Sequence, residues 1–276
     1  MTTDAHALIP AAALPPAGRP RRWVWLVAGV HAAAMVLTYA VLVATTSGQV
    51  LEGRLLPSGN IRVGDGQDIW LIGLSRQLLE VFGDNVRIAV VLAILLLIAL
   101  LLRRLRAGVV GTAVVVGSGL AAQGLKGLLI RPDLDVAGTG SHNSFPSGHV
   151  AVATGLVVAF LFVLPAGARL WLALPGAAVI AAIGTATVIA GWHRPSDVIG
   201  GVLLAGTLQL IASAVSRRGL GGGLPSVVAL TLGLSLALVV LISGAELTAV
   251  MLATTVFVGC AVVSVALALP GWQDAT

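Results

Sequence analysis

The sequence predicts an all-α fold: a polytopic integral membrane helical bundle. Hydrophobic residues make up 58% of the 276 positions and charged residues only 10%, which is more apolar than an ordinary soluble domain requires. The apolar residues also form runs near the roughly 20 residues that a helix needs to cross a hydrocarbon layer of about 30 Å. The predicted spans are residues 23–46, 86–102, 107–130, 149–165, 170–190, 198–215, 225–243 and 247–269. The 86–102 run is short, so we expect its helix to begin within 82–87.

Three parts follow from this pattern. Residues 1–22 are Ala- and Pro-rich, have no apolar core of their own, and are predicted to be a disordered cytoplasmic tail. A cleaved signal peptide is not expected, because no small-residue cleavage site is evident. Residues 23–215 are predicted to form a six-helix membrane domain. Residues 216–276 are predicted to add two transmembrane helices and a short tail. The single cysteine, Cys260, excludes an internal disulfide.

The basic residues predict the orientation in the membrane, because arginine and lysine near helix ends favour the cytoplasmic side. In an eight-span arrangement nine arginines fall on one side: Arg19, Arg21, Arg22, Arg103, Arg104, Arg106, Arg169, Arg217 and Arg218. We therefore expect an integral protein of a bacterial plasma membrane with both termini in the cytoplasm. The net charge of +5 is divided among short turns, so it indicates topology and no nucleic-acid partner.

The segment 47–85 is the longest stretch predicted to lie outside the spans. Within it, Asp68 to Asp84 has the pattern of an amphipathic helix with Asp68 as its N-cap and Trp70 suited to the headgroup level. Two roles remain open from the sequence: a lid over the helix ends, or direct contact with a lipid substrate.

A phosphate-like anion is the ligand that the segment Pro146-Ser147-Gly148-His149 favours. Ser147 is a good N-cap, and the amides that open a helix attract an anion, which Gly148 allows to approach closely. His149 stands beside this anion cradle.

His-Arg-Pro-Ser-Asp, residues 193–197, supplies a second histidine on the same predicted membrane face. His193 and Asp197 are four residues apart, close enough for the carboxylate to accept a proton from one ring nitrogen and leave the other as a nucleophile. This spacing suits a His–Asp pair better than a metal site, so neither metal nor cofactor is expected. A third cluster on that face runs from Lys126 to Arg131.

Together these three motifs resemble those of the type 2 phosphatidic acid phosphatase superfamily of membrane lipid phosphatases. The resemblance covers the six helices of residues 23–215 and implies a phosphatase domain there. It implies that His193 is the nucleophile, Asp197 its orienting partner and His149 the general acid. It further implies that Lys126, Ser147 and Gly148 bind phosphate.

Two arginines that the superfamily motifs usually contain are absent. Asp133-Leu134 follows Arg131-Pro132 where a second Arg-Pro pair is usual, and Ala186-Thr187 stands where Ser-Arg is usual. Each lost contact to a phosphoryl oxygen is worth about 1.5 to 3 kcal/mol. Arg131 is the expected substitute, with Arg194 as a second candidate that alternatively points to lipid headgroups. Asp133 and Asp135 are either solvated loop acids or groups that orient Arg131 or repel dianions.

The resemblance therefore implies a metal-independent phosphatase that acts on a lipid phosphate or pyrophosphate at the extracytoplasmic face, through a phosphohistidine. Phospholipid and isoprenoid (pyro)phosphates both fit, and the oligomeric state is not predicted. Three alternatives stay open: a degenerate member that binds or moves lipid phosphates without hydrolysis, a vanadate-dependent oxidase, and a purely structural bundle.

Overall fold

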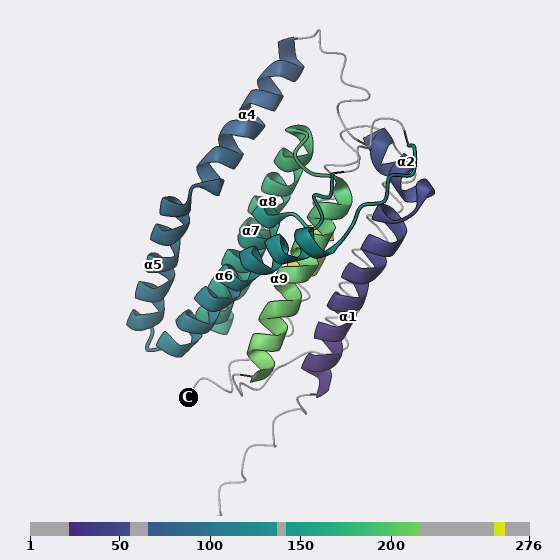
Figure 1. Ribbon diagram of the computed structural model, residues 1–276. Coiled ribbons are helices and arrows are strands. Elements are labelled where there is room, and N and C mark those ends of the chain that lie inside the picture. Colours follow the sequence, from purple (N-terminus) through teal and green to yellow (C-terminus); the bar gives the residue numbers. More distant parts are fainter. Residues whose placement is uncertain (1–21, 56–65, 137–141, 216–256, 263–276) are drawn as a thin grey trace, which may run out of the picture.

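Every regular element that the structure describes is helical. The computed structural model describes residues 22–55, 66–136, 142–215 and 257–262. The helices in chain order are α1 (Arg22–Thr38), the π-helical turn η1 (Tyr39–Val43), α2 (Thr46–Leu55), α4 (Gly66–Gly83), α5 (Asn85–Leu101), α6 (Leu105–Leu128), α7 (Gly148–Val163), α8 (Ala166–Ile189) and α9 (Pro195–Val215). Figure 1 shows α4 and α5 along one flank of the bundle and α1 along the opposite flank.

Long apolar helices make this an integral membrane protein, as the composition predicts. Within the described ranges four helices are long and apolar enough to cross a bilayer: Val24–Val43, Leu105–Leu128, Gly167–Ile189 and Pro195–Val215. Helices α4 and α5 qualify together as a fifth span that is bent by 56°, and α7 is apolar but only 16 residues long. The predicted 225–243 helix lies outside the described residues. Of the 247–269 run, residues 257–262 are described and are helical.

The starts of α4 and α5 test two predicted helix boundaries, and one prediction is wrong while the other is confirmed. Helix α4 begins at Gly66, so Asp68 lies in its first turn and the predicted N-cap is wrong. An acidic residue favours the positive end of a helix from either position, so the sequence signal does not distinguish them. Asp84 is the N-cap of α5, where its Oδ1 accepts a hydrogen bond from Val86 N at 2.8 Å. The start of α5 at Asn85 therefore falls within 82–87, as expected.

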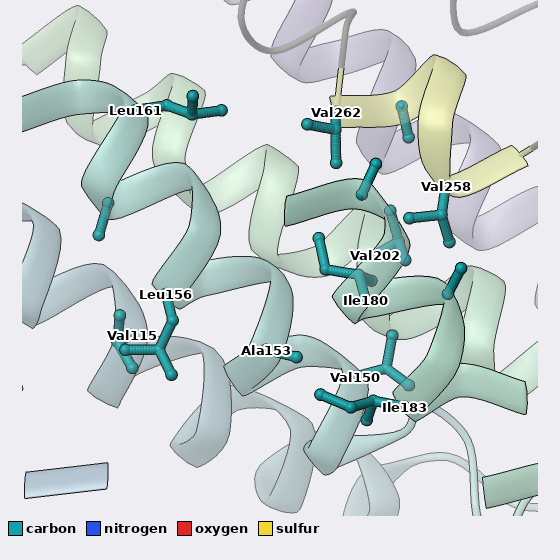
Figure 2. Packing of buried hydrophobic residues seen from close by; sticks show 14 of the residues in the cluster. Val115, Val150, Ala153, Leu156, Leu161, Ile180, Ile183, Val202, Val258 and Val262 are labelled. Carbon is teal, nitrogen blue, oxygen red and sulfur yellow. The ribbon is translucent and has the colours of Figure 1, made fainter. Parts of the chain in front are cut away.

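Helix α7 lies at the centre and packs against α6, α8 and α9. Small residues permit the close approach to α6: a Cβ atom at Gly111 would lie 2.9 Å from Ala159 Cβ. Figure 2 shows the apolar side chains that fill these contacts, including Val115 of α6 opposite Leu156 of α7. Val258 of the 257–262 segment also packs on this core. The centre of the bundle is therefore closely packed along α7.

Helix α2 changes the interpretation of the 47–85 segment. Its side chains Gln49 and Glu52 are almost completely buried, and Gln49 Nε2 donates to the carbonyl oxygens of Val43 and Pro132, each at 2.9 Å. Residues 47–55 of the predicted external segment are thus packed against the chain that follows α6. The contacts of α2 with Pro132, just after α6, and with Ser196, at the start of α9, agree with the first predicted role, a segment that packs over helix ends.

Candidate active site

His193 and Asp197 form a buried pair at the start of α9. Nδ1 of His193 lies 3.2 Å from Oδ2 of Asp197, and the two residues are only 7% and 1% exposed. The same carboxylate oxygen accepts hydrogen bonds from Arg194 N at 2.9 Å and Ser144 Oγ at 2.5 Å. Because Asp197 accepts the proton on Nδ1, the lone pair of the imidazole is left on Nε2. The predicted His–Asp pairing is present in the structure.

The Pro-Ser-Gly-His segment begins α7 and is joined directly to the His–Asp pair. Ser147 is the N-cap, and its Oγ accepts from Val150 N at 3.4 Å. Ser147 N in turn donates to Asp197 O at 2.9 Å. The helices touch here, since a Cβ atom at Gly201 of α9 would lie 2.7 Å from Ser147 O. The amide-rich start of α7 is thereby held beside His193.

His149 faces the same site as His193. The centroids of the two imidazole rings are 6.3 Å apart, and Trp192 lies 5.7 Å from His149. From the other side the α4–α5 bend approaches the ring: a Cβ atom at Gly83 would lie 3.1 Å from Nε2 of His149. Glycine permits this close approach, because a Cβ atom here would require the imidazole to shift by a few tenths of an ångström.

Lys126 reaches the start of α7 from α6. A Cβ atom at Gly148 would lie 3.9 Å from Nζ of Lys126 and 3.8 Å from Nε2 of Gln123, one helical turn earlier. An ammonium group beside a helix N-terminus provides positive charge from two sources, which suits a phosphoryl group. The sequence analysis missed Gln123, whose i, i+3 spacing from Lys126 places it on the same helix face.

Arg131 is fixed by an acid that the sequence analysis did not select. Nη1 of Arg131 lies 3.2 Å from Oε2 of Glu52 on α2, and both side chains are 1% exposed. Oε1 of Glu52 accepts a second hydrogen bond from Ser196 N at 3.1 Å. Burial, together with the nearby Asp197 carboxylate, raises the pKa of Glu52. Glu52 thus depends on these two donors to remain ionised.

Asp133 and Asp135 do not orient Arg131. Both acids are exposed, and Oδ1 of Asp133 accepts from Asp135 N at 3.2 Å. Their geometry is that of solvated loop acids. Glu52 orients Arg131 instead, from 79 residues away.

Arg194 braces the segment before α7. Its Nη1 donates to Ser144 Oγ at 3.0 Å and to His142 O at 3.3 Å. Ser144 in turn donates to Asp197, so Arg194, Ser144 and Asp197 form a connected network. The sequence left two roles open for Arg194, phosphate binding and contact with lipid headgroups. These bonds direct its Nη1 to other parts of the protein and not to lipid headgroups.

Asn143, which sequence analysis also missed, joins the Lys126–Arg131 segment to the chain that leads into Pro146-Ser147-Gly148-His149. Its Nδ2 donates to Leu129 O at 2.8 Å and to Lys126 O at 3.3 Å, while its Oδ1 accepts from Phe145 N at 3.1 Å. The end of α6 is thus fastened to the approach to α7. The only sequence signal was its place three residues before Pro146.

The fold and site together define a class: an integral membrane protein in which a His–Asp pair, a second histidine and a lysine surround a helix N-terminus. The family model of the PAP2 superfamily matches residues 122–219, a range that includes all three motifs. This match confirms the resemblance of the segment to the PAP2 superfamily. Members of this superfamily are phosphatases, often acting on lipids, and the match supports a phosphoric ester hydrolase. Searches of curated proteins and of solved structures returned no match.

Proposed function

We propose that the protein removes a phosphate or pyrophosphate group from a membrane lipid, through a phosphohistidine and without a metal. The observation that carries this proposal is the pairing of His193 Nδ1 with Asp197 Oδ2 at 3.2 Å, with His149 facing the same site. Within the described ranges no three His, Cys, Asp or Glu residues form a group that could hold a metal ion.

In the first step Nε2 of His193 attacks phosphorus. A P–N bond forms as the P–O bond to the lipid breaks, and protonated His149 gives its proton to the leaving oxygen. Asp197 stabilises the positive charge that develops on the His193 ring. Lys126 and the first amides of α7 stabilise the negative charge on the phosphoryl oxygens.

In the second step water attacks the phosphohistidine. His149, now neutral, takes a proton from the water as the P–N bond breaks, and the electron pair of that bond returns to Nε2 of His193. Inorganic phosphate leaves, and both histidines are restored to their starting states. No external oxidant or cofactor is required for either step.

A cavity beside the α4–α5 bend supports a lipid as the substrate. It has a volume of about 370 Å³, and its wall includes Phe82 of α4, Leu156 of α7, and Ala182 and Ile183 of α8. Phe82 precedes Gly83, the residue that approaches His149. We propose that this bend cavity takes the hydrocarbon chain next to the phosphorylated end of the lipid. Its occupant would be apolar, because the wall is almost entirely hydrocarbon.

We also place the site at the extracytoplasmic face, with both termini in the cytoplasm. The support is the distribution of the nine arginines on the opposite side of the predicted spans. The phosphatase motifs lie within the predicted six-helix domain of residues 23–215.

Phosphate release from a panel of lipid phosphates tests the function. The purified protein in detergent, with EDTA present, is expected to release phosphate from at least one phospholipid or isoprenoid (pyro)phosphate. Loss of all activity in EDTA, with recovery on adding a divalent cation, would contradict the metal-independent mechanism. Release equal to that of the His193→Ala variant on every substrate would contradict hydrolysis itself.

A non-hydrolytic lipid-phosphate-binding role is the second candidate, favoured by one observation. Thr187 occupies the position of a usual motif arginine, is fully buried, and donates its hydroxyl hydrogen bond to Gly184 O at 2.7 Å. It therefore offers no cation to phosphate. Tight binding of a lipid phosphate by wild-type protein that releases no phosphate would support this role.

Narrowing the bend cavity is expected to affect lipid substrates selectively. Ala182→Phe should raise KM for a long-chain lipid phosphate about tenfold, because excluding about two methylene groups costs about 1.6 kcal/mol. For a short water-soluble phosphate ester, kcat/KM should stay unchanged. Steady-state kinetics on both substrates measures the difference.

The matched control is Leu174→Phe, on the same helix but exposed and outside the cavity wall. It should leave both substrates unaffected. If Ala182→Phe impaired the two substrates equally, or neither, the cavity would not hold the lipid chain.

A further inference from the structure

Glu52 joins two parts of the site that are far apart in the sequence. One carboxylate oxygen pairs with Arg131 Nη1 at 3.2 Å, and the other accepts from Ser196 N at 3.1 Å. These partners are 79 and 144 residues away from Glu52. Ser196 lies in the first turn of α9, next to Asp197. Helix α2 therefore contacts both the end of the Lys126–Arg131 segment and the turn that carries the His–Asp pair.

Glu52 accepts a hydrogen bond from only one nitrogen of the Arg131 guanidinium, Nη1. Nε and Nη2 of Arg131 are buried and have no hydrogen-bond partner among the described residues. Buried donors of a charged group are costly when unpaired, so they indicate an acceptor that binds there. The donors form a planar edge, which matches two oxygens of a phosphoryl group.

The position of the Arg131 guanidinium agrees with that assignment. Arg131 is close enough to Arg194 for their positive charges to interact, and Glu52 is similarly close to Asp197. The guanidinium therefore lies near the His–Asp pair. It offers the kind of donors that Thr187 cannot supply.

We propose that Glu52 is a positioning residue that holds one edge of Arg131 so that its Nε and Nη2 bind a phosphoryl group. The inference rests on the proposed function for its substrate. It adds a residue of α2 that acts through Arg131 and, through Ser196, fixes the start of α9. Glu52 does not itself touch phosphate, since both of its oxygens face donors and it carries the same charge sign.

Kinetics and phosphate binding of Glu52→Gln test the proposal. Glutamine keeps an oxygen for Ser196 N but loses the charge that holds Arg131. We expect KM for the lipid phosphate and the inhibition constant of inorganic phosphate to rise together by about tenfold. The rise in melting temperature that inorganic phosphate produces in wild type should shrink correspondingly. Glu80→Gln, which neutralises an exposed acid on α4, is the control and should change none of these.

A double-mutant cycle separates positioning from a purely structural role. If Glu52 acts through Arg131, then Glu52→Gln should add little to the loss of phosphate affinity already caused by Arg131→Met. Independent, additive losses would overturn the proposal, as would unchanged phosphate affinity in Glu52→Gln. If the Gln variant does not fold, Glu52→Asp is used, because its shorter side chain should give the same paired rise in KM and inhibition constant.

The phosphate-binding measurement also distinguishes the two proposals. If wild type binds inorganic phosphate and Glu52→Gln does not, while no lipid is hydrolysed, the positioning role stands and the proposed hydrolysis fails. If wild type hydrolyses lipid but Glu52→Gln matches it in KM and phosphate affinity, the positioning role alone fails.

Discussion

Replacing His193 with alanine is expected to reduce phosphate release by on the order of 10⁴-fold or more, because the variant has no group to form the covalent intermediate. The buried carboxylate of Asp197 keeps its bonds from Ser144 and Arg194 N, so the site should stay assembled. Wild type quenched in base during turnover of a ³²P-labelled substrate should carry label on the protein. His193→Ala should carry none.

His142→Ala is the matched control, since His142 is an exposed histidine that enters the network only through its backbone oxygen. Its activity and labelling should equal those of wild type. Labelled protein in the His193→Ala variant would show that another residue is the nucleophile, and an unlabelled but fully active wild type would argue for direct attack by water.

The second large effect is expected at His149, and it should depend on the leaving group. His149→Ala should lower turnover of an aliphatic lipid phosphate by about 10²- to 10⁴-fold, the usual contribution of a general acid. With p-nitrophenyl phosphate, whose leaving oxygen needs no proton, the loss should stay below about tenfold. Parallel measurement of kcat on the two substrates gives the ratio.

His193→Ala supplies the comparison, because loss of the nucleophile should affect both substrates severely. Equal losses on the two substrates for His149→Ala would remove His149 from the role of acid. Its contact with Gly83 at the α4–α5 bend and with Trp192 would then make it a residue that shapes the site.

The superfamily match of residues 122–219 and the local parts of the site could be predicted because they depend on near neighbours. His193 and Asp197 are four residues apart, so a single helical turn brings them together wherever the helix lies. Ser147 caps α7 through Val150 N, three residues on. Apolar runs predict membrane helices because the bilayer requires each span to satisfy its own backbone hydrogen bonds. Exact helix ends could not be predicted in the same way, as Asp68 shows. An acidic residue is favoured both as an N-cap and in the first turn, so its presence does not fix the first residue of the helix.

The long-range parts of the site required the tertiary structure. Glu52 gave no motif signal, since its meaning comes from Arg131 and Ser196, which only the packing of α2 brings near. Asn143 and Ser144 likewise act on partners from other segments.

By itself the sequence determined that the chain is an all-α membrane protein with a His–Asp pair and a helix capped by Ser147, because hydropathy and helical spacing act over one or two turns. Only the tertiary structure decided how the charge of Arg131 is directed and that the α4–α5 bend meets His149. The physical reason is burial: in a core that excludes water each charge must find a partner, and folding can bring that partner from any part of the chain.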